Sequence, residues 1–566
     1  MNEAEKAQVQ PCKYWRLYEK GIDYITKKRI IERTNKNWNF FSGKQWEGIQ
    51  AGGESLPFLN FIKPTIKHKV STVSQNNMVA HYSDAEGNEE LQAVYNMLDQ
   101  KFSACWEHAN MDMVLWSTIK DAAVTGDGIL YFGTENMDDV QRLPNTSLMY
   151  GDESEQDIQK QPYFIIHQRL LVGTVKEMAR ANGVSENEIE LIVADKETNY
   201  TVGNRDEVEE ETSANNSKVT VLFYFTKVDG IVHVAKCTRA VVIEPIRPIA
   251  STNPDGTLRT GLTLYPVVKY SWEDFPNDAR GLSEVEQLIP NQLEVNKTLA
   301  RRSMIIKLTA YPRMAYDENA IQNPEELEKV GKPIAVQTGG VQSISQMIAY
   351  LNPAQSNGDP KNYADDIMEY SQELSGSGET AMGNINPTRV AASAIIAIRD
   401  QAALPLNEQV AKMKTFVEEY AKLAIELWMV YNPYGMDVLV SKTDPVTGME
   451  ISELQTITKE NWDQMKPDIR IDTSQDSPWT KEAEQNLLDA LLEKQHISFE
   501  EYVELSTEHG IVPKNKLKKI LEKRRIVQGQ MAAQQATAMR DQINNDPEGF
   551  AQQQWAQEEE LGEGEQ

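Results

Sequence analysis

The sequence has 566 residues, too many for one compact core, so several domains are expected. Hydrophobic residues make up 40% of the chain and aromatic residues 8%, which excludes a protein that is disordered throughout. The formal net charge of −28 excludes a surface that grips nucleic acid by neutralising phosphates, but it is compatible with a surface past which nucleic acid slides, as it is with ordinary solubility.

The cellular compartment of the protein is predicted from three features that the sequence lacks. No apolar run approaches the length needed to span a bilayer, and the polar N-terminus has no apolar core of a signal peptide. Cys12, Cys105 and Cys237 are unclustered and predict neither a disulfide framework nor a zinc site, as in a reducing cytoplasm. We therefore expect the protein to stay in the compartment where it is made.

The first quarter of the chain is predicted to be helical. One helix is expected over residues 13–37 and a second over 61–77, where Ile62, Ile66, Val70 and Val73 recur at helical spacing. A further helical stretch over 89–126 is expected to close at Gly126. The first convincing strand follows at 127–134.

Residues 161–272 are predicted to form a β-rich unit, because β-branched and aromatic runs dominate there. Asp229-Gly230 between two such runs is a hairpin signal. The acidic stretch 196–218 is expected to be a poorly ordered insertion in this unit.

A second helical region begins at 281–308, where Pro290 is expected to break or kink the helix. A small unit follows, read as a strand at 311–318, a helix at 323–331 and a strand at 332–340. The next helix has Asp359 placed to cap it, Pro360 at its first position and Gly376 just past its end. Its apolar stripe is Tyr363, Ile367, Tyr370 and Leu374.

The stretch "GSGETAMGNINP" at 376–387 begins like a phosphate-binding loop, with four residues between Gly378 and Gly383. A P-loop needs Lys and then Ser or Thr after the second glycine, whereas Asn384 and Ile385 stand there. No nucleotide or other cofactor is therefore predicted, and the glycines indicate a flexible connector.

The C-terminal third starts with a very long helix over 388–431, in which Pro405 is expected to produce a kink. Strands are predicted within 436–454 and 467–474, and helices over 480–525. The tail from 526 is rich in Gln and Glu, and its end is predicted to be disordered. The fold class is therefore α+β and predominantly helical.

The sequence contains none of the enzyme motifs that we looked for. It has no HExxH, its seven histidines lack metal-ligand spacing, and it has no G-x-S-x-G. We predict no enzyme, and no catalytic, cofactor-binding or metal-binding residue.

The order of these parts resembles that of the portal proteins of tailed bacteriophages. Four stretches that together span roughly 30–430 carry the resemblance: "FFSGKQWEGI" with "PFLNFIKPTIKHKVSTV", "YPVVKYSWEDFPNDARGLSEVEQLIPNQLEVNKTLARR", "YPRMAYDENAIQNPEELEKVGKPIAVQTGG" and "GETAMGNINPTRVAASAIIAIRDQAALPL". "DIRIDTSQDSPWTKEAEQNLLDALLEKQHISFEEY" continues the likeness. No single motif among them is diagnostic; the ordered set indicates the family.

The resemblance implies a ring with wing, stem, clip and crown regions around a central channel. The implied regions are a wing at 1–280, a first stem helix at 281–308, a clip at 309–345, a second stem helix region at 346–376, a tunnel loop at 377–388, a long kinked wing helix with a β return at 389–479, a crown at 480–530 and a C-terminal tail at 531–566.

The family resemblance also implies partners and a location. Twelve copies are expected to close a ring at one capsid vertex, through which double-stranded DNA passes without sequence specificity during packaging and ejection. The terminase large subunit and then head–tail adaptors are expected to dock on the clip, and the major capsid and scaffolding proteins to surround the ring. The protein is expected in the virion after assembly in the cytoplasm of a bacterial host, with no membrane partner.

The resemblance implies roles for particular residues, and each role has a simpler alternative. The tunnel loop is assigned Gly376, Gly378, Glu379, Gly383, Asn384, Asn386 and Pro387; the alternative is a solvent-facing connection. Glu379, Asp365 and Asp366 are candidates to face the channel, or they are simply solvated. Lys297, Arg301 and Arg302 are candidates for a basic belt that touches phosphates, or for ion pairs between subunits.

In the clip, Arg313, Tyr316, Lys332 and Pro333 are candidates for a partner-facing surface, or for contacts within the ring. The basic run at 514–525 is expected to be a solvated helix face, with contact to packaged DNA as the alternative. Two other functions stay open: a different structural protein of the capsid or tail, such as an adaptor or shell subunit, and an enzyme of the DNA-packaging machinery. The missing Lys after Gly383 opposes the second.

Overall fold

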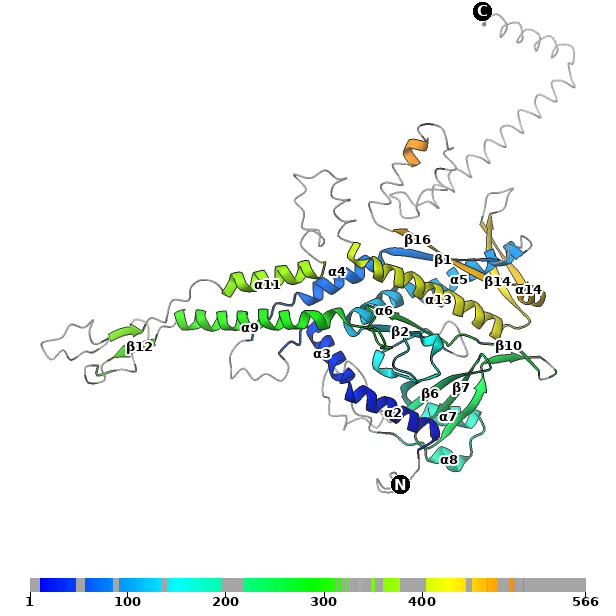
Figure 1. The fold of residues 1–566 in the computed structure, drawn as a ribbon, viewed down its shortest axis with the longest axis horizontal. Helices are drawn as coiled ribbons and strands as arrows, with labels where there is room; N and C mark the ends of the chain where they lie inside the picture. The colour runs from blue at the N-terminus through cyan, green and yellow to red at the C-terminus, as the bar shows by residue number, and fades with distance from the viewer. Residues whose placement is uncertain are drawn as a thin grey trace, which may run out of the picture. The chain divides into compact units, whose positions relative to one another are not determined.

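The fold comes from a computed structural model. It describes residues 11–46, 56–84, 91–133, 140–195, 218–253, 257–310, 313–316, 321–323, 348–351, 360–376, 404–443, 450–465, 467–475 and 488–492, with a few single residues between them. The chain divides into two units, one of residues 1–438 and 456–474 and the other of residues 439–455 and 475–566. The first contains almost everything described below (Figure 1).

The N-terminal part of the first unit is built from helices. They are α2 (Lys13–Lys27), α3 (Ile30–Ser42), α4 (Ile62–Ser74), α5 (Gln92–His108) and α6 (Met111–Thr125). The helix predicted over 13–37 is interrupted at Arg29, with φ of 54°, and that over 89–126 at Asn110, with φ of 49°. A left-handed residue cannot continue a right-handed helix, so the prediction of one helix over 13–37 was wrong, whereas the predicted helical stretch over 89–126 is confirmed as two helices.

The predicted end at Gly126 is confirmed, because its φ of 104° closes α6. A Cβ added there would lie 2.2 Å from the carbonyl oxygen of Gly281, so the two backbones approach as only glycine allows. The predicted stripe of α4 is confirmed as well, since Ile62, Ile66 and Val70 are fully buried. These helices form the core on which the later elements pack.

A strand absent from the prediction, β1 (Asn76–Asp84), follows α4 directly and pairs with β16 (Pro467–Gln475). β16 itself lies in the predicted strand at 467–474. The strand β1 forms by pairing with a segment far away in the chain. The sequence of 76–84 alone therefore gave no recognisable strand pattern.

Two antiparallel sheets contain strands of the predicted β-rich unit at 161–272, together with β2, β3 and β4, which precede it. Strand order in the larger is β4-β5-β6-β7-β8, and in the smaller β11-β2-β3. Their bounds are β2 (Asp127–Phe132), β3 (Val140–Leu143), β4 (Leu148–Tyr150), β5 (Tyr163–Leu171), β6 (Lys218–Val228), β7 (Ile231–Cys237), β8 (Val242–Pro248) and β11 (Val267–Ser271), with a β9 (Ala250–Thr252) and β10 (Leu258–Gly261) pair beside them.

The turn between β6 and β7 is the predicted one. Asp229 and Gly230 have φ of 52° and 80°, the left-handed pair that a two-residue hairpin turn requires. Two helices, α7 (Val172–Ala181) and α8 (Glu186–Glu190), interrupt this unit and were not predicted. The predicted insertion at 196–218 lies outside the described residues except for Lys218, the first residue of β6.

Helix α9 (Glu284–Ala310) continues through Pro290, so a break, one of the two predicted effects, is wrong, and a kink stays a prediction. Pro290 lies early in the helix, where its missing N–H leaves only the carbonyl of Glu286 without a helical partner. Helix α11 (Pro360–Leu374) starts with Pro360 as predicted, and Gly376 follows its end with φ of 70°. Asp359 lies outside the described residues.

Between α9 and α11 the structure has a strand pair, β12 (Arg313–Tyr316) with β13 (Ile348–Leu351). β12 lies in the predicted strand at 311–318, but its partner is not the predicted strand at 332–340. Within that range the structure describes only Ala335 and Gln337, neither of them in a strand. The segment 348–351 was missed because four residues give too short a pattern to recognise.

The last elements are the turn η5 (Leu404–Leu406), α13 (Asn407–Tyr431), β14 (Gly435–Thr443), β15 (Glu450–Thr458) and α14 (Lys459–Gln464). Pro405 was expected inside a helix, yet it lies in η5 directly before α13, where a proline costs no helical hydrogen bond. The strands predicted within 436–454 are confirmed. The predicted helices at 480–525 fall outside the described part of the chain, apart from short pieces such as 488–492, which are helical.

The described residues combine helices with several small sheets, so the α+β class is confirmed.

Candidate functional site: the paired helices α9 and α11

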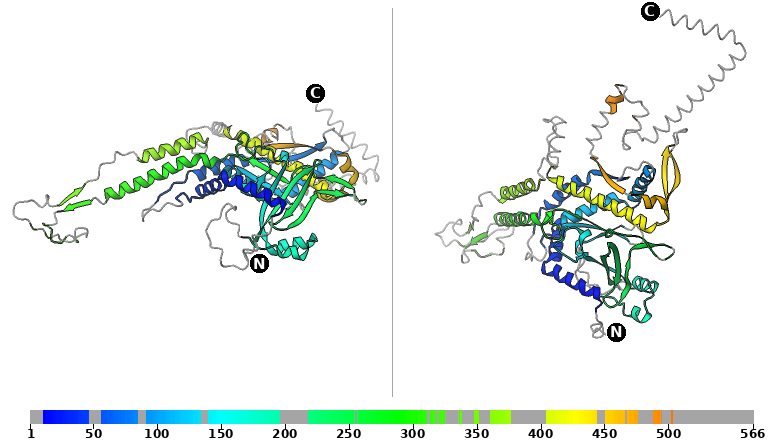
Figure 2. Two further views of the ribbon diagram at one scale, coloured as in Figure 1. Left: turned by 60° about the horizontal axis from the view of Figure 1, so that its bottom comes forward. Right: turned by 45° about the vertical axis from the view of Figure 1, so that its right-hand side comes forward.

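Helices α9 and α11 lie side by side, as two further views confirm (Figure 2). At 1.5 Å per residue, the 27 residues of α9 extend over roughly 40 Å. The contact uses small side chains of α11, since Ala364 and Ser371 are buried. The Asn291 side-chain amide donates to Ser371 Oγ at 2.9 Å and links the two helices.

The first half of α9 is held by a buried amide network. Gln292 Oε1 accepts the N–H of Phe61 at 3.1 Å, and Gln292 Nε2 donates to the carbonyl of Leu59 at 2.7 Å. Asn296 Nδ2 donates to Gln45 Oε1 at 2.6 Å, and Asn296 Oδ1 accepts Gln292 Nε2 at 3.0 Å. Both α9 amides are fully buried, so their polar atoms need these partners. We call these three side chains, Gln45, Gln292 and Asn296, the amide clamp.

The amide clamp and its partner Phe61 join the first two of the four stretches that carry the family resemblance. Gln45 lies in "FFSGKQWEGI", Phe61 in "PFLNFIKPTIKHKVSTV", and Gln292 and Asn296 in the α9 stretch. Sequence reasoning missed the clamp. The one available signal was a pair of amides four residues apart, which places both on one face of the helix.

Two ion pairs anchor the first turn of α9. Lys69 Nζ lies 2.6 Å from Glu284 Oε1, and both side chains are largely buried. Trp272 Nε1 donates to the other carboxylate oxygen of Glu284 at 3.2 Å. Arg33 binds Glu286 through two hydrogen bonds, of 3.0 and 2.8 Å. Negative charge at a helix N-terminus is favourable in addition, because it opposes the helix dipole.

Charge is unevenly distributed along the pair. The acidic residues of α9 are Glu284, Glu286 and Glu294, and the basic residues that follow them are Lys297, Arg301, Arg302 and Lys307. Helix α11 carries four carboxylates against one lysine. The second half of α9 is therefore basic, whereas α11 is acidic.

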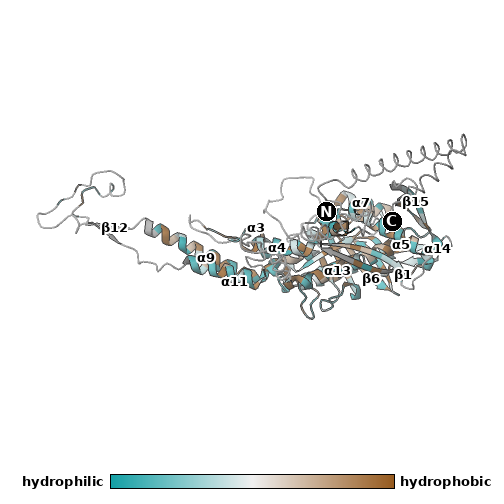
Figure 3. Ribbon diagram, turned by 90° about the horizontal axis from the view of Figure 1, so that it is seen from above, coloured by the Kyte–Doolittle hydropathy of each residue, from teal (hydrophilic) through white to brown (hydrophobic). Residues whose placement is uncertain are grey.

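Large apolar side chains are exposed on the same two helices. The predicted stripe of α11 does not enter the core of this chain: Tyr370 is 61% exposed, Leu374 is 87% exposed, and Tyr363 is also exposed. Met304 and Ile306 are exposed on α9. Hydrophobic and hydrophilic residues alternate along both helices in Figure 3. A surface of this kind is typical of protein contact sites.

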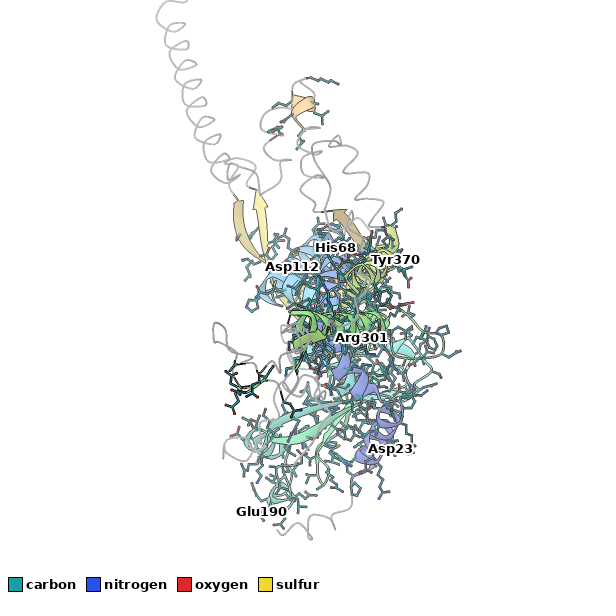
Figure 4. The ribbon with its side chains drawn as sticks, turned by 90° about the vertical axis from the view of Figure 1, so that its left-hand side faces the viewer. Asp23, His68, Asp112, Glu190, Arg301 and Tyr370 are labelled. Atoms are coloured by element: carbon teal, nitrogen blue, oxygen red, sulfur yellow. The ribbon has the colours of Figure 1, made fainter. Side chains whose placement is uncertain are left out.

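The predicted stem residues all fall on this pair. Lys297 and Arg301 are exposed, Arg302 is partly exposed, and Asp365 and Asp366 are exposed on α11. Arg301 forms an ion pair with Glu294 of its own helix, at 3.6 Å. Figure 4 labels Arg301 on α9 and Tyr370 on α11. The choice between phosphate contact and subunit pairing stays a prediction.

Of the predicted tunnel-loop residues, the structure describes Gly376, which lies just past the end of α11. A Cβ added to Gly376 would lie 3.4 Å from Cβ of Pro405, so the end of α11 lies against the turn before α13. The chain therefore leaves and returns at neighbouring points. The remaining loop candidates lie outside the described residues: Gly378, Glu379, Gly383, Asn384, Asn386 and Pro387.

The predicted clip residues are only partly described. Arg313 and Tyr316 are the end residues of β12, in register with Leu351 and Ile348 of β13. Lys332 and Pro333 lie outside the described residues.

Elsewhere, two adjoining pockets of about 230 and 320 Å³ share Thr34, Thr125 and Asn145. Asp121 lines the second, and its burial raises the pKa of its carboxyl group to about 6, against the opposing effect of Arg142 at 3.1 Å. Asp121 and Arg142 form an ion pair at the wall of this pocket. Among the described residues, no cluster of His, Cys, Asp or Glu is placed to hold a metal ion, and no helix could cross a membrane.

Comparison with known proteins adds no family assignment. No protein-family model matches the sequence, and no curated protein matches it.

Proposed function

We propose that this chain is a portal protein of a tailed bacteriophage: copies close into a ring around a channel for double-stranded DNA. The single observation that carries this proposal is the surface of α9 and α11. It combines exposed apolar side chains with a basic half on one helix and an acidic partner helix. Such a surface is complementary to a second copy of itself.

The geometry of that surface favours a ring over a symmetric dimer. In a head-to-tail contact, the basic second half of α9 meets the acidic α11 of the neighbour, which is a heterologous interface. Heterologous contacts repeat and close into a ring when the rotation between copies allows it. Tyr370, Leu374 and Met304 then lose their exposure to water, at about 25 cal/mol per Å² of apolar surface buried.

The order of elements supports the assignment of regions. Helix α9 is the first stem helix, the β12–β13 strand pair is part of the clip, and α11 is the second stem helix. The segment between Gly376 and Pro405 contains the tunnel loop, since it leaves and returns at neighbouring points. The elements before α9 form the wing, together with α13, which packs on β11.

The net negative charge of the chain supports the proposed passage of DNA through the ring. Each copy contributes a formal net charge of −28, and duplex DNA carries one negative charge per about 1.7 Å of axis. An acidic wall repels this polyanion and gives no sequence-specific grip. In this proposal the clip binds the terminase large subunit during packaging and head–tail adaptors afterwards, at a capsid vertex formed with the major capsid and scaffolding proteins.

Electron microscopy of the purified full chain tests the proposal. Rings with a central hole are expected for the wild type. Tyr370→Ser with Leu374→Ser is expected to abolish rings and leave a folded monomer, because both side chains are exposed within one copy. The matched control is Met113→Ser, an exposed apolar side chain on α6, which should leave the rings intact. A wild type that stays monomeric at assembly concentrations contradicts the proposal.

A further inference from the structure

Two of the three cysteines meet in the fold, so their description as unclustered was wrong for this pair. Cys12 directly precedes α2, and its N–H donates to the carbonyl of Arg239 at 3.0 Å. Its thiol donates to the carbonyl of Thr238 at 3.6 Å. Cys237, the last residue of β7, directly precedes Thr238 and belongs to the hydrophobic cluster against which Cys12 packs.

The contact belongs to a well-packed part of the molecule. Cys237 is fully buried in the hydrophobic cluster where α2 covers the five-stranded sheet, together with Tyr14 and Leu222. Cys12 packs against the edge of that cluster and is only partly buried, so a small reagent reaches it before it reaches Cys237. The third cysteine, Cys105, is buried on α5.

The two thiols are unlike in acidity. The neighbouring Cys237 thiol lowers the pKa of Cys12 to about 6, against the effect of burial and helped by the backbone N–H groups of Trp15 and Tyr14. The neighbouring Cys12 and burial raise the pKa of Cys237. Accessibility and the lowered pKa both favour Cys12 as the cysteine that attacks, with the buried Cys237 as the one that resolves.

We propose that Cys12 and Cys237 form a thiol–disulfide exchange site, at which a small organic disulfide such as oxidised glutathione converts them to an intramolecular disulfide. The Cys12 thiolate forms a bond to one sulfur of the small disulfide, whose S–S bond breaks and releases one small thiolate. Cys237 then gives its proton to solvent and attacks the Cys12 sulfur, which releases the second small thiolate. The two cysteines lose two electrons and the small disulfide gains them.

The bond would fasten the start of α2 to the end of β7. It closes a long loop of chain, so the oxidised form is expected to unfold at a higher temperature than the reduced form. This inference concerns a single copy and does not depend on the proposed ring.

The test uses full-length Cys105→Ala, which leaves the pair as the only cysteines in the chain. After incubation with oxidised glutathione at pH 7, thiol titration should find no free thiol. Intact mass should show the loss of two hydrogens without added glutathione, and peptide mapping should join the peptides that contain Cys12 and Cys237.

Two variants separate the roles. With Cys237→Ala added, the reaction should stop at a glutathione mixed disulfide on Cys12. With Cys12→Ser added, Cys237 should stay free, and a serine hydroxyl suits the position before a helix. Alkylation of Cys12 by iodoacetamide at pH 7 should slow about tenfold when Cys237 is replaced, because less thiolate is present.

Three outcomes would overturn the proposal. One is two free thiols after oxidation of protein whose circular dichroism shows it folded. Another is a stable mixed disulfide on Cys12 while Cys237 is still present. The last is a disulfide between two chains.

Discussion

Among single residues, Glu419 on α13 has an unusual environment. Burial raises the pKa of its carboxyl group to about 7, and nearby Asp157 and Glu418 raise it further, while Lys422 and Lys269 oppose them. The folded chain therefore holds this proton more tightly than the unfolded chain, whose value is near 4.5. The stability linked to the group is present at low pH and is lost as pH rises from about 4.5 to about 7.

Glu419→Gln should remove this loss, because the amide carries no charge to bury. After a discount for partial exposure, the free energy of unfolding at pH 8 should rise by about 1–2 kcal/mol, with much less change at pH 5. Urea unfolding at the two pH values measures the difference. Glu107→Gln on an exposed face of α5 is the control and should give the same small change at both. Equal effects of Glu419→Gln at pH 5 and pH 8 would contradict this account.

At the scale of elements, α9 shows how one helix serves two environments. Its first half holds buried amides and ion pairs, whereas its second half exposes charge and apolar surface. The change occurs after Thr298, the last buried residue among those described in α9; Arg301, Met304 and Ile306 beyond it are exposed. The amide clamp thus fixes the root of the helix and leaves the rest free to contact another chain.

Asn296→Leu should destabilise the fold by about 2–4 kcal/mol, because the buried amides of Gln45 and Gln292 lose partners. Lys297→Leu, one position along, replaces an exposed side chain and should change stability by no more than about 0.5 kcal/mol. Urea denaturation of both variants measures the contrast. If both variants lose a similar amount of unfolding free energy, the amide clamp stabilises the fold no more than an exposed side chain does.

For the whole molecule, the proposed ring depends on charge complementarity between copies. The basic belt of α9 includes Arg301 and Arg302, and the acidic α11 includes Asp365 and Asp366. Among the described residues of one copy, Arg301 pairs only with Glu294, in an exposed contact that contributes about 1 kcal/mol or less. Reversing these charges should therefore act on assembly far more than on folding.

The double variant Arg301→Glu, Arg302→Glu should sediment as monomers where the wild type sediments as rings. The protein concentration at which half of the chains are assembled should rise at least tenfold. Adding Asp365→Lys and Asp366→Lys should recover part of the assembly, since each interface regains opposite charges. Sedimentation velocity at low and at high salt measures both, and high salt should weaken the wild type as well. If assembly is unchanged by the four charge reversals, this interface between copies is excluded.

The sequence by itself determined the features that depend on neighbouring residues. Gly126 ends α6 and Asp229-Gly230 turns a hairpin, because each needs a positive φ that few residues adopt; Pro360 starts α11 because its fixed φ suits a first turn. The same local reasoning could not foresee the breaks at Arg29 and Asn110, where ordinary residues take a left-handed conformation.

Only the tertiary structure decided which distant residues meet. The amide clamp, the β1–β16 pair and the contact of Cys12 with Cys237 each join segments far apart in the chain. The tertiary structure also decided which face of α11 is buried, since Ala364 and Ser371 pack on α9 while Tyr370 and Leu374 stay exposed. Helical spacing shows that apolar side chains share a face, but whether that face meets the same chain or another depends on the packing of the whole fold.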